Sequence, residues 1–111
     1  MVEKFEFEVQ GNAVQPYRVR FRVEGTNMTA TCTCRAGQAG QHCKHRSELL
    51  LGVVSHLVHE PGPEFDRLHA LLPNTDVWHR LQELAAAEQA IEAAKRKRSS
   101  VAKALSRAMR D

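Results

Sequence analysis

The chain has 111 residues, which limits it to one small domain with a short extension and excludes a multi-step enzyme with its own cofactor domain. Hydrophobic residues make up 42% and charged residues 26%, the balance of a soluble globular protein, and no apolar run is long enough to cross a membrane. The first residues are charged and alternate with apolar ones, unlike a secretory signal, so we expect a cytoplasmic protein.

The formal net charge of +3 is unevenly distributed along the chain. Residues 95–111 hold seven basic side chains and one acidic side chain, so this segment carries a charge of +6. Residues 1–94 therefore carry −3. The excess of positive charge belongs to the C-terminal tail, and the body of the domain is not basic.

Alternating apolar and polar residues predict three strands, at about residues 5–9, 17–23 and 28–34. Turn signals separate them, at Gly11-Asn12 and at Gly25-Thr26-Asn27. Short turns between successive strands favour an antiparallel arrangement. The first third of the chain is therefore predicted to form a small three-stranded antiparallel sheet.

All three cysteines lie in one short segment after the third predicted strand. An odd number of clustered cysteines fits metal binding in a reducing compartment better than a disulfide framework. With a neighbouring histidine they supply the four donors of a closed tetrahedral zinc site, namely Cys32, Cys34, Cys43 and His45. Residues two apart in a strand point to the same side, so Cys32 and Cys34 can share an ion. One structural Zn²⁺ would then join the sheet to the helix that follows.

Other interpretations of this segment stay open. The cysteines could be buried thiols beside a chance histidine, or a redox switch, although the Cys-x-x-Cys spacing of oxidoreductases is absent. An iron–sulfur cluster would ordinarily use four cysteines. His42 could replace His45 as the fourth ligand, although His42 lies in the predicted loop of residues 35–42.

Two helices are expected after the cysteine segment. Apolar residues at helical spacing predict a helix at about residues 44–59, which the sequence Glu60-Pro61-Gly62-Pro63 would end. A short helix is predicted over residues 64–72, before Pro73.

A long helix is predicted from about Val77 towards the C-terminus, with a cap signal at Asn74-Thr75-Asp76. Alanine-rich stretches favour this helix. Four consecutive cations interrupt its apolar face, and Ser99-Ser100 could be a break or a new cap. The apolar face consists of Trp78, Leu81, Leu84, Ala85 and Ile91, and it resumes at Val101, Leu105 and Met109.

The predicted fold class is α+β: a small antiparallel three-stranded sheet plus a helix, joined by one structural zinc, with a helical C-terminal extension. Residues 1–60 would form the zinc-binding unit. Residues 61–111 would form the helical C-terminal region, with its basic tail at residues 95–111.

The cysteine segment resembles the SWIM-type zinc finger over about residues 17–54. The residues that carry the resemblance are Cys32-x-Cys34, a variable loop, and Cys43-Lys44-His45 before an apolar helix. The resemblance implies a strand–strand–helix unit with zinc on these four ligands, and binding to DNA or to proteins. The triplet Arg46-Ser47-Glu48 is more polar than the residues that often follow the histidine in this family.

The basic residues make nucleic acid, DNA rather than RNA, the first candidate partner, because cations can neutralise phosphates. The candidate contacts are Arg18, Arg20, Arg22, Lys44, Arg46, Lys95, Arg96, Lys97 and Arg98. Two plainer interpretations compete. The strand arginines could simply pair with glutamates on the solvent face of the sheet, and the tail could be a solvated end of a helix.

The second candidate partner is a protein, bound through the long C-terminal helix or through a homodimer of that helix. Glu88, Lys95 and Arg98 lie on its seam and argue against a long homodimeric coiled coil. The competing interpretation is that the helix folds back and completes the core. We expect no enzymatic activity, since the thiols are explained as zinc ligands and no nucleophile is paired with a histidine.

Overall fold

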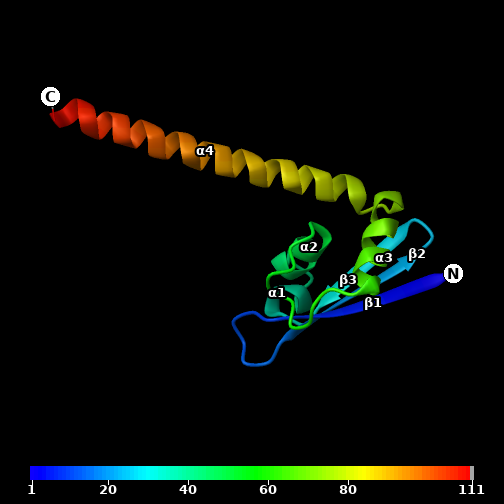
Figure 1. Cartoon of the computed structure of the whole chain (residues 1–111). Helices are drawn as coiled ribbons and strands as arrows, with labels where there is room; N and C mark the ends of the chain where they lie inside the picture. Colours follow the sequence, from blue (N-terminus) through cyan, green and yellow to red (C-terminus); the bar gives the residue numbers. More distant parts are fainter. Residues whose placement is uncertain (111) are drawn as a thin grey trace. The chain divides into compact units, whose positions relative to one another are not determined.

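The computed structural model describes residues 1–110 and divides into two compact units, Met1–Leu81 and a second that begins at Gln82 (Figure 1). Asp111 of the predicted basic tail lies outside the described residues. In chain order the elements are β1 (Val2–Val9), β2 (Tyr17–Glu24), β3 (Asn27–Cys32), α1 (Arg35–Gln38), α2 (Lys44–Leu50), α3 (Pro63–Leu71), the 3-10 turn η1 (Leu72–Asn74) and α4 (Trp78–Arg110).

The three predicted strands form one antiparallel sheet in the order β1-β2-β3. Its register places Phe5 opposite Phe21 and Val19 opposite Cys32. Because side chains alternate between the two faces of a strand, this register gathers the apolar residues on one face and the charged residues and threonines on the other. The predicted α+β fold is thereby confirmed.

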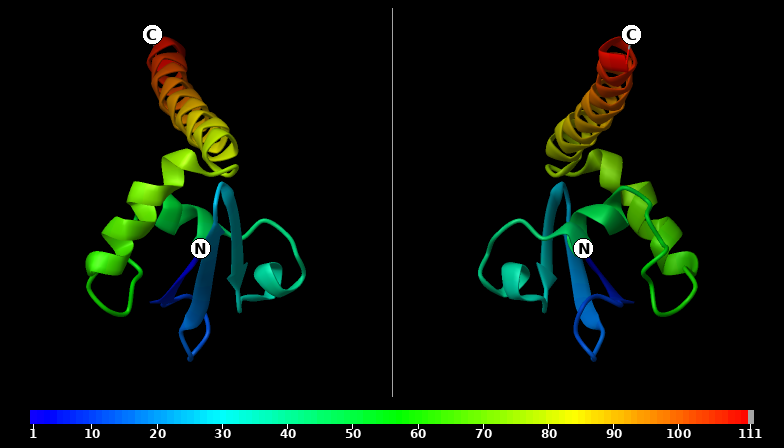
Figure 2. Two further views of the ribbon diagram at one scale, coloured as in Figure 1. Left: turned by 90° about the vertical axis from the view of Figure 1, so that its right-hand side faces the viewer. Right: turned by 90° about the vertical axis from the view of Figure 1, so that its left-hand side faces the viewer.

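The apolar face of the sheet forms the core with α2, α3 and the first residues of α4, and α2 and α3 lie on the same side of the sheet (Figure 2). Phe21, Leu68, Leu72 and Val19 are its largest fully buried side chains. Phe7 contacts Phe21 and Phe65 edge to face, at ring-centroid distances of 6.1 and 5.8 Å. These aromatic contacts join β1 to its neighbour β2 and to α3 across a small core.

Helix α2 ends at Leu50, so the prediction of one helix over residues 44–59 is wrong beyond that residue. The cause is Gly52, whose φ of +87° is left-handed. The Gly52 N–H donates to the Leu49 carbonyl at 3.2 Å and the Val53 N–H to the Glu48 carbonyl at 2.9 Å. This pair of hydrogen bonds is the Schellman motif, which satisfies the last carbonyls of the helix and turns the chain away.

The segment after this turn pairs with the free edge of β1. Leu57 forms an antiparallel bridge with Val9, the Gln10 N–H donates to the His56 carbonyl at 2.8 Å, and the Val58 N–H donates to the Glu8 carbonyl at 3.0 Å. Half-buried Leu57 packs against the core. The segment around Leu57 therefore covers the C-terminal end of the β1 edge, which would otherwise be open to pairing with another chain.

Helix α3 confirms the predicted short helix, and a bidentate ion pair ties it to β1. Arg67 donates to both carboxylate oxygens of Glu3, at 2.9 and 2.8 Å. The hydrogen bond from Arg67 lowers the pKa of Glu3. Planar two-point pairs of this kind fix orientation as well as charge, so α3 is aligned along the strand.

Asp76, part of the predicted cap signal of the long helix, binds the β2–β3 hairpin. Its carboxylate accepts a hydrogen bond from the Met28 N–H at 3.0 Å, and its own N–H donates to the Thr26 carbonyl at 2.8 Å. These two bonds anchor the chain just before α4. Within the first turns of α4, Leu81 is buried.

Helix α4 is continuous to Arg110, so Ser99-Ser100 is neither a break nor a new cap. Serine costs little in a helix interior when strong helix formers flank it, as alanine, lysine and arginine do here. Over the described residues, none of the helices has the length and apolar character that crossing a bilayer requires.

Replacing Gly52 tests the end of α2. Gly52→Ala should lower the free energy of unfolding by about 1 kcal/mol, because an alanine is strained at this φ although open space surrounds the position. Chemical denaturation measures the change. Gly62→Ala is the matched control, since its φ is −112° and the added Cβ meets only the mobile carboxylate of Glu64. An equal loss in both variants would contradict the strained-turn explanation.

Candidate metal centre

Four donor side chains converge where the sheet meets α2. Cys32 ends β3, and Cys34 is the N-cap of the short helix α1. Cys43 is the N-cap of α2, and His45 lies in its first turn. The three thiols are 3–6% exposed and the imidazole is half-buried. The sheet and the helix entrance thus bring together the four residues that the spacing predicts.

The ligand atoms of these four residues all lie within 4.8 Å of one another. The Sγ atoms of Cys34 and Cys43 are 3.3 Å apart, and the His45 Nδ1 lies 3.5 Å from the Cys43 Sγ and 3.8 Å from the Cys32 Sγ. Tetrahedral zinc would separate two sulfurs by about 3.8 Å and a sulfur from a nitrogen by about 3.6 Å. The cluster therefore fits one tetrahedral ion and could hold a metal.

The surroundings shift the pKa values of Cys32 and Cys34 in opposite directions. Burial raises the pKa of Cys32 to about 12. Burial also acts to raise the pKa of Cys34, but the N–H of Gly37, which donates to its Sγ at 3.3 Å, and bonds with Cys43 and His45 outweigh it and lower that pKa to about 6. Cys34 is therefore prepared as a thiolate, which is the form that binds a metal.

Gly37 is close to the backbone of Cys32. A Cβ on Gly37 would lie 2.5 Å from the Cys32 carbonyl oxygen and 2.8 Å from its Cβ. Only glycine allows α1 to approach β3 this closely, and this approach aims the Gly37 N–H at Cys34.

Arg46 and Tyr17 support the cluster, and the sequence analysis assigned neither to it. The Arg46 guanidinium donates to the Ala30 carbonyl at 3.1 Å and to the Gln41 carbonyl at 2.6 Å, joining β3 to the loop before Cys43. The Tyr17 ring packs on the His45 ring at a centroid distance of 4.9 Å. Arg46 was named for phosphate binding, but its guanidinium is engaged with these carbonyls. The only sequence signal for the support role is its place directly after the ligand triplet.

His42 lies outside the cluster and is exposed, whereas His45 faces the thiols. Of the two candidate histidines, the geometry favours His45. All three cysteines are free thiols.

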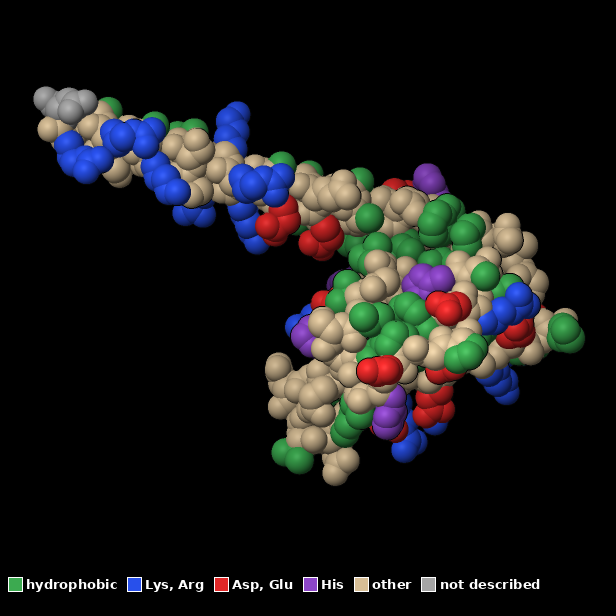
Figure 3. All heavy atoms as spheres, in the orientation of Figure 1, with side chains coloured by type: hydrophobic (Ala, Val, Ile, Leu, Met, Phe, Trp, Pro, Cys, Tyr) green, Lys and Arg blue, Asp and Glu red, His purple; other side chains and the backbone are tan. Residues whose placement is uncertain are grey.

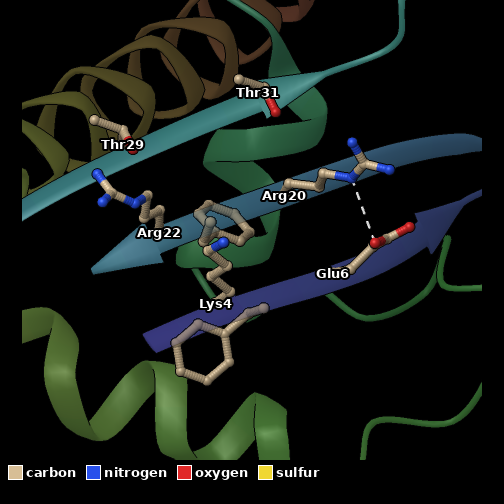
Figure 4. Close-up of a pocket in the computed structure, with 8 residues that line it drawn as sticks. Lys4, Glu6, Arg20, Arg22, Thr29 and Thr31 are labelled. Carbon is tan, nitrogen blue, oxygen red and sulfur yellow. Dashed lines mark hydrogen bonds and ion pairs between the residues drawn. The ribbon is translucent and has the colours of Figure 1, made fainter. Parts of the chain in front are cut away.

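Arg20 and Arg22 stand on the uncovered face of the sheet, beside Lys4, Thr29 and Thr31 (Figure 4). Arg18 and Arg20 both pair with Glu6, with Nε–oxygen distances of 3.8 and 3.3 Å. Arg22 pairs with Glu24 at 2.9 Å. The predicted pairing of arginines with glutamates is therefore present, and it partly neutralises this face.

The remaining candidate cations are exposed. Lys44 lies on the first turn of α2, and Lys95, Arg96, Lys97 and Arg98 form a continuous basic segment of α4. Within this segment Lys95 pairs with Glu92 at 3.4 Å. Figure 3 shows lysine and arginine side chains along the C-terminal half of α4.

Comparison of the chain with family models, with curated proteins and with solved structures gives no match.

Removing one thiol tests the metal centre. Cys43→Ser should abolish stoichiometric zinc and the cooperative unfolding transition, because three donors leave the shell incomplete and binding energy is folding energy in small metal domains. Metal analysis of the purified protein and thermal unfolding measure both. His42→Ala should keep its zinc. A well-folded, zinc-free Cys43→Ser protein of unchanged stability would refute the site.

Adding one methyl group tests the support of Cys34. Gly37→Ala should lower stability by about 1–3 kcal/mol, because the new Cβ collides with the backbone of Cys32. It should also speed zinc transfer to a chelator, since the N–H bond to Cys34 must shift. Stopped-flow absorbance with a zinc indicator measures that rate. Ala39→Ser, an exposed change in the same segment, should leave the rate unchanged.

Proposed function

We propose that the chain is a SWIM-type zinc-binding module that binds nucleic acid, DNA in particular, with zinc in a structural role. The observation that carries the proposal is the convergence of Cys32, Cys34, Cys43 and His45, whose ligand atoms lie within 4.8 Å of one another. The motif order, a Cys-x-Cys on a strand end and a Cys-x-His at a helix entrance, supports the SWIM type.

Zinc is the metal that this donor set favours. Three thiolates and one imidazole are soft and borderline ligands, and a four-donor shell suits tetrahedral Zn²⁺ better than an oxygen-seeking cation. Four protein donors leave no open coordination position, so the proposal includes no catalytic step. The metal would instead hold residues 35–42, which form α1 and the turn after it, are mostly exposed and have no large apolar side chain.

Nucleic-acid binding is supported by the uneven charge. The arginines on the sheet already have carboxylate partners, and Arg46 is bonded to backbone carbonyls. The exposed cations of α4 have fewer acidic neighbours, since residues 95–110 contain seven basic and no acidic side chains. Phosphate binding would therefore depend mainly on Lys95–Arg98 and the cations after them, with Lys44 and the sheet arginines contributing less.

Fluorescence anisotropy with labelled DNA and RNA, as duplexes and single strands, tests this proposal. A variant with Lys95, Arg96, Lys97 and Arg98 all changed to Gln should lose roughly tenfold or more in affinity at low salt. The reason is that each of these cations, on binding a phosphate, releases counterions condensed on the nucleic acid. It should also show a shallower dependence of affinity on salt.

The matched control changes the four sheet cations Lys4, Arg18, Arg20 and Arg22 to Gln and should lose less affinity. Absence of binding by the wild-type chain at low salt, or an equal loss in both variants, would overturn the assignment to α4. A preference for RNA over DNA would correct the class of nucleic acid.

A second candidate function is a protein-interaction adaptor. The observation that favours it is a set of large apolar side chains on α4 that are about half or more exposed, Ile91, Val101, Leu105 and Met109. Such side chains on one helix suit a helical partner.

A further inference from the structure

Helix α4 carries a seven-residue repeat from Leu84 to Ala108. Positions that are three and four residues apart in turn lie on one stripe of the helix. The stripe is Leu84, Ala87, Ile91, Ala94, Arg98, Val101, Leu105 and Ala108. Seven of these eight side chains are apolar. Every second position of the stripe holds an alanine or a valine, which lets two helices approach closely.

Leu84 is half-buried, but the other three large apolar side chains of this stripe are exposed. Ile91 is 48% exposed, Val101 57% and Leu105 58%. In proteins, most of the stability of a helix comes from the packing of its apolar face rather than from helix propensity. The stripe therefore calls for a partner helix.

The charges of α4 are divided along its length. Glu83, Glu88 and Glu92 are acidic and precede the run Lys95–Arg98, and every charged side chain from there to Arg110 is basic. A parallel pair of such helices would bring two copies of the basic run to the same level, which is unfavourable. An antiparallel pair brings the acidic part of each copy beside the basic run of the other.

We propose that α4 pairs with α4 of a second copy of this chain as an antiparallel coiled coil. In the register that the charges select, Leu84 packs against Val101 of the second copy, Ala87 against Arg98, and Ile91 against Ala94. The same contacts repeat by two-fold symmetry, as a closed dimer requires. This pairing names the partner in the adaptor function proposed above.

The charges distinguish this register from its neighbour. One heptad further along, the two-fold axis would pass near Arg96, and Lys95 and Lys97 would each face their own copies. In the selected register, Glu88 faces Lys95 of the second copy and lies near its Arg98. Arg98 is thereby accommodated, because its opposite neighbour, Ala87, is small and a carboxylate lies within reach. Glu88, Lys95 and Arg98, which argue against a parallel coiled coil, would form reciprocal ion pairs in the antiparallel one.

In the dimer, Lys95 and Arg98 face Glu88 of the second copy, so the other cations of α4 would remain for phosphate. Arg96, Lys103 and Arg110 lie on the opposite side of α4 from the stripe by their heptad positions. Dimerisation would therefore leave them exposed. Since the test below contains no nucleic acid, its result is separate from that of the binding titration.

Sedimentation equilibrium of the full zinc-loaded chain over a range of concentrations tests the pairing. The wild type should show a reversible monomer–dimer equilibrium. Glu88→Lys and Lys95→Glu should each weaken the dimer by roughly tenfold or more, because two attractive contacts become repulsive. The double variant Glu88→Lys/Lys95→Glu should recover most of the loss. Residues 88 and 95 lie roughly 10 Å apart along one helix, so recovery reports a contact between copies.

Arg96→Glu is the matched control. It reverses a charge beside Lys95 but on the outer side of the helix, and it should leave the dimer nearly unchanged. Circular dichroism of each variant checks that helix content is kept. A wild-type chain that stays monomeric up to submillimolar concentration would overturn the proposal, and so would a dimer in which the double variant is as weak as the single ones. Equal weakening by Arg96→Glu would overturn the register.

Discussion

The fold of residues 32–45 depends on one constraint, the convergence of three thiols and one imidazole at the junction of β3 and α2. The loop that these side chains bracket is mostly exposed and contributes no large side chain to the core. Its course is set instead by short polar contacts: the Gly37 N–H on Cys34 and the Arg46 guanidinium on two carbonyls. A bound ion would close this arrangement, since the ligand atoms of the four donors already lie within 4.8 Å of one another.

The sheet supplies the rigid base for that junction. One face is buried by α2 and α3, and the edge of β1 is covered by the short extended segment around Leu57. The other face is open but partly neutralised, because Glu6 lies between Arg18 and Arg20. A surface of paired charges is a solvated face with modest energetic value. Within the unit Met1–Leu81, the candidate function therefore lies with the cluster of three cysteines and His45 rather than with the open face of the sheet.

The C-terminal helix poses a different problem. Its cations suit phosphate, and its stripe of Leu84, Ile91, Val101 and Leu105 suits another helix. The two demands overlap at Lys95 and Arg98, whereas Arg96, Lys103 and Arg110 lie opposite the stripe and serve phosphate alone. Both functions depend on the exposed apolar and basic side chains that α4 carries.

Local patterns in the sequence determined the three strands, the four-donor set, the short helix α3 and the continuous helical character of the C-terminal region, because alternation, ligand spacing and propensity act over a few residues. Tertiary structure decided the rest. Residues 51–58 have a helical apolar pattern, yet the left-handed Gly52 and the free edge of β1 make them an edge segment. Asp76 has the character of a helix cap, yet the β2–β3 hairpin offers it a backbone N–H. Arg46 resembles a phosphate ligand, yet two carbonyls brought together by folding engage it. Leu57, Asp76 and Arg46 each have a partner distant in sequence, namely Val9, Met28 and Ala30, and only the folded chain brings such partners within reach.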